Sequence, residues 1–255
     1  MKKNDYAGIF AIIFVLVVFH ASACGARDFG KKNVFNVAGL GYLNFFTERM
    51  KSQFDLSLYL VTDAPEKCRL GLLGTVEAAI AGGVTIVQYR SENPDAGTCY
   101  AEAKALAEFL RPRGVPFIVN NRVDLALALD ADGVHVGQSD LPVPVVRKLI
   151  GEEKILGFSV SNRAELDAVD AAKMDYLGIG PVFPTISKAD ASPDLGLADF
   201  AALAARSPLP VVAIGGLDVA RARAVRATGT VAGIAVVSAI CGAEDPAAAA
   251  RALAM

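Results

Sequence analysis

Residues 175–188 read Asp175-Tyr176-Leu177-Gly178-Ile179 and then Gly180-Pro181-Val182-Phe183-Pro184-Thr185-Ile186-Ser187-Lys188. The first segment is typical of a buried parallel strand, because both faces of such a strand are apolar. The second places hydroxyl groups, backbone amides and one lysine on a loop at the carboxyl end of that strand. In repeating βα folds, ligands bind at this end of the strands. The stretch therefore predicts an anion-binding loop, suited to a phosphate, on an α/β scaffold.

The same pattern repeats from Leu58 to the end of the chain, where short β-branched runs alternate with Ala-rich amphipathic segments. Such alternation indicates parallel strands that are each covered by a helix. Strands are predicted near 58–62, 84–89, 116–120, 133–136, 155–160, 175–179, 210–214 and 232–237. Helices are predicted near 66–81, 95–111, 122–130, 142–150, 162–172, 197–205, 218–228 and 245–254. Eight such units predict an α/β (β/α)8 TIM barrel; a doubly wound open sheet is the alternative, although no G-x-G-x-x-G follows the first strand.

The composition of the chain limits the classes of function. The protein has 255 residues, of which 53% are hydrophobic, and a formal net charge of −2. This composition indicates one globular domain without the basic surface that nucleic-acid binding requires. The four cysteines are widely spaced and form no C-x-x-C pair, so they predict neither a zinc site nor a disulfide framework. We expect Cys68, Cys99 and Cys241 to fill apolar space.

The amino-terminal residues fit two interpretations. Lys2 and Lys3 precede the apolar run 9–19, which is followed by Ala21-Ser22-Ala23-Cys24-Gly25, as in a secretory signal or a lipoprotein processing site. Alternatively, residues 1–49 are an extension of a domain that starts at Met50. We favour the second interpretation and expect a single barrel over residues 50–255, located in the cytoplasm. The alternative is a protein anchored in a membrane through residues 1–25.

Polar side chains end several of the predicted strands, and in a barrel these ends meet on one face. Gln88 and Arg90 end the second strand; a guanidinium there suits a phosphate or, equally, a surface salt bridge. Asn120 and Asn121 end the third strand, where one of them would also suit a helix cap. Asp140 follows the fourth strand, and its carboxylate suits Mg²⁺ or a cap on the helix that begins at Pro142.

Two further features bear on the site. His135 lies within the apolar strand 133–136, and we expect it to be a hydrogen-bonded core residue rather than a catalyst. The seventh and eighth strands end in Gly215-Gly216 and Val237-Ser238, at positions where barrels bind phosphate with backbone amides. Together with the Thr185 loop, these turns predict room for more than one phosphate.

Several motifs resemble those of thiamine-phosphate synthase, in the family's order and at similar spacing: Val87-Gln88-Tyr89-Arg90, Val119-Asn120-Asn121-Arg122-Val123-Asp124, Gly133-Val134-His135-Val136-Gly137-Gln138-Ser139-Asp140, Gly180 to Lys188, and Val212-Ala213-Ile214-Gly215-Gly216. The resemblance implies a TIM-barrel transferase of thiamine biosynthesis. Its reaction joins 4-amino-5-hydroxymethyl-2-methylpyrimidine diphosphate to 4-methyl-5-(2-hydroxyethyl)thiazole phosphate and releases pyrophosphate, with Mg²⁺ as cofactor. The family mechanism is dissociative and needs no protein nucleophile.

The resemblance also implies roles for individual residues. The pyrimidine diphosphate would be bound by Gln88, Arg90 and Asn120. The thiazole phosphate would be bound by Thr185, Ser187, Gly216, Val237 and Ser238. Mg²⁺ would be bound by Asn121 and Asp140. Ser159, near the pyrimidine and the departing pyrophosphate, and Lys188, at the leaving pyrophosphate, are the expected catalytic residues.

This chain departs from the family pattern at two positions: Glu92 stands where a lysine is usual, and Asn121 where many relatives have Asp. A carboxylate at position 92 would repel a diphosphate unless it turns outward or helps to bind metal. One alternative function is that of the related thiazole tautomerases, whose histidine would fall near Ser161, where this chain has none. The other is a membrane-anchored protein that binds a phosphorylated ligand without turnover. The sequence leaves both a monomer and a homo-oligomer open.

Overall fold

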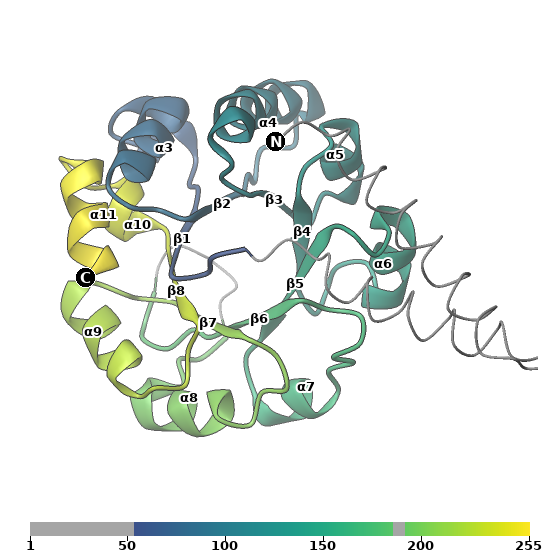
Figure 1. The fold of residues 1–255 in the computed structure, drawn as a ribbon, viewed down its shortest axis with the longest axis vertical. Helices are drawn as coiled ribbons and strands as arrows, with labels where there is room; N and C mark the ends of the chain where they lie inside the picture. Colours follow the sequence, from purple (N-terminus) through teal and green to yellow (C-terminus); the bar gives the residue numbers. More distant parts are fainter. Residues whose placement is uncertain (1–53, 186–191) are drawn as a thin grey trace, which may run out of the picture. The chain divides into compact units, whose positions relative to one another are not determined.

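The computed structural model describes residues 54–185 and 192–255, and within them the chain forms a closed barrel of parallel strands (Figure 1). The strands are β1 Leu58–Val61, β2 Ile86–Tyr89, β3 Phe117–Asn120, β4 Gly133–Val136, β5 Ile155–Val160, β6 Tyr176–Ile179, β7 Val211–Ile214 and β8 Gly233–Val236. Each strand pairs with the next one along the chain, and β1 also pairs with β8, with Leu58 beside Ile234. This closure confirms the TIM barrel and excludes the open sheet.

Helices surround the barrel and cover its outer face (Figure 1). They are η1 Pro65–Lys67, α3 Gly71–Ala81, α4 Ala96–Leu110, η2 Arg111–Arg113, α5 Val123–Ala128, α6 Val143–Ile150, α7 Arg163–Asp167, α8 Gly196–Ala204, α9 Val219–Ala227, α10 Ser238–Cys241 and α11 Pro246–Ala254. Carboxylate or amide oxygens cap the amino ends of four of them, from Asp95, Asn162, Asp218 and Asp245. These caps satisfy backbone N–H groups that a helix leaves without a partner.

The helix predictions are wrong in three places. The segment predicted as one helix over 66–81 is a short 3-10 turn followed by α3, which begins at Gly71 in a left-handed conformation with φ of 68°. The helix predicted over 162–172 ends at Asp167, because the Asp170 side chain accepts from the Ala172 N–H and offers the backbone a turn instead. The short helix α10 was not predicted.

Apolar side chains pack in two layers, one inside the barrel and one between the barrel and its helices. Side chains two residues apart on a strand share a face. The interior layer accordingly contains alternate strand residues: Tyr59, Val61, Ile86, Ile118, Ile155, Tyr176, Val212 and Ala235. Phe54 and Leu56, which precede β1, pack against this layer at the amino end of the barrel. The Phe54 and Tyr176 rings meet edge to face, with their centroids 6.0 Å apart.

A buried ion pair joins α6 to the amino ends of the strands. The Arg147 guanidinium donates to the Asp175 carboxylate at 2.8 Å, and the two side chains are 5% and 6% exposed. The same carboxylate accepts from the backbone N–H of Leu156 on β5. Because these groups bond to one another across α6, β5 and β6, we interpret the pair as structural.

The prediction that Cys68, Cys99 and Cys241 fill apolar space is confirmed, since all three are buried within the apolar core. Within residues 54–185 and 192–255, every helix is too short or too polar to cross a bilayer. The apolar run 9–19, Cys24 and the loop residues Ser187 and Lys188 lie outside these described ranges.

Candidate active site

Polar side chains form the upper layer of the barrel interior, at the carboxyl ends of the strands. Gln88 is level with Val61 on β1, Asn120 is paired with His135 on β4, and Ser159 is paired with Gly178 on β6. Gln88 and His135 are buried, whereas Asn120 and Ser159 are half-buried and open toward the rim. The strand period therefore brings three predicted substrate residues to one face.

A chain of hydrogen bonds crosses the interior and joins Gln88 to Ser159. The Gln88 Nε2 group donates to the Tyr59 hydroxyl at 2.9 Å, and the hydroxyls of Tyr59 and Tyr176 are 2.8 Å apart. The Tyr176 hydroxyl lies 2.9 Å from His135 Nδ1, and His135 Nε2 lies 2.9 Å from Ser159 Oγ. The prediction that His135 is a hydrogen-bonded core residue is confirmed.

Two glycines make the space that these rings occupy. A Cβ atom at Gly157 on β5 would overlap the Tyr176 ring and His135 Nδ1, and one at Gly178 on β6 would lie 3.2 Å from His135 Cε1. Gly157 is the strand partner of both His135 and Tyr176. Burial raises the pKa of the Tyr59 and Tyr176 phenols well above the ordinary value, so both remain O–H donors at neutral pH.

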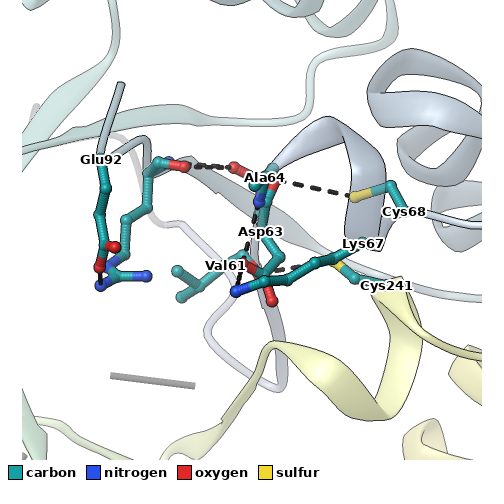
Figure 2. A network of polar contacts seen from close by, with 9 residues as sticks. Val61, Asp63, Ala64, Lys67, Cys68, Glu92 and Cys241 are labelled. Atoms are coloured by element: carbon teal, nitrogen blue, oxygen red, sulfur yellow. Dashed lines mark hydrogen bonds and ion pairs between the residues drawn. The ribbon is translucent and has the colours of Figure 1, made fainter. Parts of the chain in front are cut away.

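Arg90 is held at the end of β2 by its backbone and paired through its side chain. Its N–H donates to Thr62 Oγ1 at 3.0 Å, and the Thr62 hydroxyl donates to the Arg90 carbonyl. The guanidinium forms an ion pair with the Glu92 carboxylate, the acidic departure from the family pattern (Figure 2). The Arg90 side chain is 16% exposed and that of Glu92 is 72% exposed. Glu92 thus occupies a position on Arg90 that an anionic ligand would also take.

Asn121 and Asp140 follow β3 and β4, and neither of them caps a helix. Asn121 adopts a left-handed backbone with φ of 60°, and its N–H donates to the His135 carbonyl at 2.9 Å. Asp140 Oδ2 accepts from the Gly137 N–H at 2.7 Å. The capping alternatives for these residues are therefore wrong. Asn121 also lines a cavity together with Glu92 and Asn120, between the loops after β2 and β3.

The donor set fits Mg²⁺ in kind, because an amide oxygen and a carboxylate oxygen are hard ligands, and this ion retains several water ligands. Among the described residues, no three His, Cys, Asp or Glu side chains cluster as they would to hold a metal by themselves.

The turns after β6 and β7 pack closely on one another. Val182 and Phe183 donate their N–H groups to the carbonyls of Ile214 and Gly215. A Cβ atom at Gly216, where φ is 63°, would overlap the Pro184 carbonyl. Glycine is therefore required here by both conformation and space. This packing places the half-buried Thr185 on the loop that lies beside the Gly215-Gly216 turn.

Val237 and Ser238 lie at the start of α10, directly after β8, the strand that pairs with β7. The end of β1 contacts α10 through Val61 and Cys241 (Figure 2). The Cys241 thiol lies 3.9 Å from the Val61 carbonyl, and the buried Asp63 carboxylate accepts from Ala64 N–H at 2.9 Å and from Lys67 at 3.3 Å.

The structure thus brings the predicted residues on β2 to β5 to one face of the barrel, and those on β6 to β8 to neighbouring turns at the same end; Ser187 and Lys188 lie outside the described residues. The roles of the two interior tyrosines and their glycines were not predicted from the sequence. The sequence signal for the tyrosines was a hydroxyl group at alternate, interior positions of otherwise apolar strands.

Polar side chains at successive strand ends, around a glycine turn after β7, define the class of (β/α)8-barrel enzymes that act at the carboxyl end of the barrel.

Comparison with known proteins identifies the family within this class. Residues 58–240 match the family model described as thiamine monophosphate synthase. Over 206 residues the chain is 52% identical to the thiamine-phosphate synthase of Laribacter hongkongensis (strain HLHK9), covering 80% of this chain and 96% of the relative. It is 48% identical over 204 residues to that of Azorhizobium caulinodans, covering 80% and 96%. Thiamine phosphate pyrophosphorylase from Pyrococcus furiosus superposes with a TM-score of 0.68 at 39% identity, covering 78% of this chain and 93% of that chain.

The chain belongs to the thiamine monophosphate synthase family. This confirms the resemblance drawn from the motifs, together with the predicted enzyme class, a transferase of thiamine biosynthesis.

Proposed function

We propose that the chain condenses 4-amino-5-hydroxymethyl-2-methylpyrimidine diphosphate with 4-methyl-5-(2-hydroxyethyl)thiazole phosphate, forming thiamine phosphate and pyrophosphate. The observation that carries the proposal is the convergence of Gln88, Asn120 and Ser159 in one interior layer at the rim, in a chain of this family. These side chains offer amide and hydroxyl groups to a polar heterocycle, and the neighbouring loops offer cations and amides to phosphates.

Gln88, Arg90 and Asn120 bind the pyrimidine diphosphate in this proposal. The Arg90 guanidinium suits a phosphate because it presents several N–H groups in one plane. Its pairing with Glu92 means that the diphosphate must displace a carboxylate that is largely exposed to water. Glu92 is thereby a competitor for Arg90, which reduces affinity for the diphosphate without blocking the site.

Ser159 and Lys188 act on the leaving group. Pyrophosphate departs first, the electron-rich aminopyrimidine stabilises the methylene cation that remains, and the thiazole nitrogen then adds to this cation. Negative charge grows on the departing oxygens, so a hydroxyl donor and an ammonium group held beside them lower the barrier. No protein nucleophile takes part. Catalysis therefore depends on placement of groups before the bond breaks.

Thr185, Ser187, Gly216, Val237 and Ser238 bind the thiazole phosphate. Backbone amides at the glycine turn and at the start of α10 supply N–H donors, and the hydroxyls supply O–H donors. The tight packing of the Gly216 turn against Pro184 supports a fixed position for these amides. Such a cradle holds the thiazole nitrogen in line with the carbon that it attacks.

Asn121 and Asp140 would hold the cofactor, Mg²⁺. When bound, such an ion would supply positive charge to the phosphates of the leaving group. The contributions of the two residues are to orient their oxygens: the left-handed Asn121 backbone is tied to His135, and Asp140 is tied to Gly137.

The full chain incubated with both phosphorylated substrates and Mg²⁺ tests the proposal through the formation of thiamine phosphate. A tautomerase or a binding protein would make none, and absence of product at every Mg²⁺ concentration would overturn the proposal. Lys188→Ala is the matched variant. We expect it to lower turnover far more than it weakens binding of the thiazole phosphate, measured by titration, because its charge acts on the leaving group. Equal turnover in the variant would refute that role.

A further inference from the structure

We propose that the buried hydrogen-bond chain from Gln88 to Ser159 runs in one direction, with the ring hydrogen of His135 on Nε2 and the Ser159 hydroxyl hydrogen turned toward the ligand. In this arrangement Tyr59, Tyr176 and His135 are positioning residues that act through Ser159. The role given to Ser159 rests on the proposed function, whereas the direction of the chain rests on the orientation of the Gln88 amide and the hydrogen bonds that follow from it.

The direction follows from the donor at the start of the chain. The Gln88 amide nitrogen can only donate, so the Tyr59 oxygen accepts from it. Among the described residues, the other recorded partner of the Tyr59 hydroxyl is Tyr176, so Tyr59 donates its single hydrogen there. Tyr176 then donates its own hydrogen to His135 Nδ1, which must be the ring nitrogen without hydrogen.

His135 Nε2 consequently carries the ring hydrogen and donates it to Ser159 Oγ, 2.9 Å away. Since Ser159 accepts this bond, its own hydroxyl hydrogen remains to be donated to a ligand. The half-buried position of Ser159 at the rim gives a ligand access to it. A departing pyrophosphate carries only acceptor oxygens, so a hydroxyl turned this way stabilises it.

The reverse direction would not serve this chemistry. It requires the Gln88 amide to be turned over, so that its oxygen accepts from Tyr59 and every later bond reverses. Ser159 would then donate to His135 and present only lone pairs to the anion. The orientation of the Gln88 amide, across the barrel, thus determines whether Ser159 presents a hydrogen-bond donor or only acceptors to the ligand.

The interior is shaped for this chain of contacts rather than for apolar packing. Gly157 and Gly178 leave out the side chains that would overlap or crowd the His135 and Tyr176 rings. Tyr59 and Tyr176 are 1% and 0% exposed, so a hydroxyl without a partner would be costly there. Both phenols have a pKa raised by burial and keep their hydrogens, as the direction requires.

The position of the ring hydrogen can be observed directly, because the chain has two histidines, His20 and His135. The full chain with His20→Gln and ¹⁵N-labelled histidine gives one imidazole spectrum, recorded without substrate at about pH 8, where an ordinary imidazole is neutral. We expect Nε2 to bear the hydrogen and Nδ1 to bear none. A hydrogen on Nδ1 would overturn the proposal.

Tyr176→Phe in the same background removes the donor to Nδ1, and we expect the two nitrogens to become more alike. Tyr89→Phe is the matched control: it also removes a buried phenol hydroxyl, which donates to Glu102 outside this chain, and should leave the His135 spectrum unchanged. An unchanged spectrum in Tyr176→Phe would contradict the direction. Should that variant fail to fold, the spectrum of the His20→Gln chain still decides.

The positioning role is tested by a double-mutant cycle on turnover. We expect Tyr176→Phe to lower kcat about tenfold, the size of one misdirected hydrogen bond, with little change in KM for the thiazole phosphate. Combined with Ser159→Ala, it should cause no further loss, because both act through one hydroxyl. Fully additive losses would overturn the positioning role. A chain that makes no thiamine phosphate would instead overturn the proposed function, and the substrate-free spectrum would still report the direction.

Discussion

Two arginine–carboxylate pairs lie at opposite ends of the barrel and differ in how they are enclosed. Arg147 and Asp175 lie near the amino ends of β5 and β6 and are almost completely buried. The Arg147 guanidinium also donates to the carbonyls of Lys173, Gly151 and Lys154. Arg90 and Glu92 lie after β2 at the carboxyl end, where the carboxylate is mostly exposed.

The difference indicates what each pair can do. Removing one member of the buried pair would leave the other charge buried without its counter-charge, which is costly, so we interpret that pair as structural. The Glu92 carboxylate can return to water at little cost and release the guanidinium to another anion. The same chemistry therefore stabilises the structure at one end of the barrel and permits exchange of partners at the other.

The largest expected effect is at the buried pair. Asp175→Ala should lower the free energy of unfolding by about 3–5 kcal/mol, because it leaves Arg147 charged and buried. Denaturant unfolding followed by circular dichroism measures this loss. The control is Asp167→Ala, which breaks the ion pair between Arg163 and the 57% exposed Asp167 carboxylate on α7 and should change stability little. Equal losses in the two variants would remove the distinction between enclosed and open pairs.

The fold could be predicted from the sequence because the barrel depends on the periodicity of apolar residues. This periodicity is visible within single short segments, such as the strand that contains Leu177 and Ile179. The sequence did not predict α10, since Ser238 to Cys241 are too few to show a helical period. The sequence also did not show whether the Glu92 side chain turns outward or toward the site. Arg90 and Glu92 are two residues apart, as on one face of a strand, which in retrospect favoured their pairing.

The polar interior was harder to predict. Tyr59 and Tyr176 were treated as apolar strand residues, because a sequence does not say that their hydroxyls meet across a barrel. That contact depends on the register of several strands and on the space left by Gly157. Gln88 and Asn120 were predicted because they lie at or next to the ends of their strands, whereas Ser159 was assigned only through the family resemblance.

The second prediction concerns the packing of the barrel interior at the carboxyl ends of the strands. Gly157→Ala should lower the free energy of unfolding by about 1–3 kcal/mol through overpacking, and displace the rings that position Ser159. Turnover should therefore fall in enzyme that remains folded. Gly97→Ala, the same change in the first turn of α4 where the nearest atom is 3.3 Å away, serves as control and should be neutral or stabilising. Normal turnover in folded Gly157→Ala would mean that the interior side chains accommodate the added methyl group without displacing Ser159.

The third prediction tests exchange at the open pair. Glu92→Gln removes the competing charge and keeps the size of the side chain, so KM for the pyrimidine diphosphate should fall about two- to fivefold with little change in stability. Steady-state kinetics at fixed Mg²⁺ measures it, and the difference should shrink at high salt because an exposed charge is screened. A rise in KM would instead assign Glu92 to ligand or metal binding.

The smallest effect is expected from removing residues 1–49. We propose that this segment is not needed for folding or activity. Among the described residues, the amino end of the interior layer is already covered by Phe54, whose ring meets Tyr176, and by the buried Leu56. A chain that starts at Met50 should keep the melting temperature and turnover of the full chain. One that starts at Ser57 should lose about 3 kcal/mol, because it uncovers the amino end of the interior layer.

Sequencing the amino terminus of the native protein completes this test. A mature protein that begins at Met50 agrees with a cytoplasmic enzyme whose barrel is sufficient for function. Loss of activity in the Met50 form, or a native chain that begins at a lipid-modified Cys24, would contradict the proposal. Such a result would favour anchoring through residues 1–25.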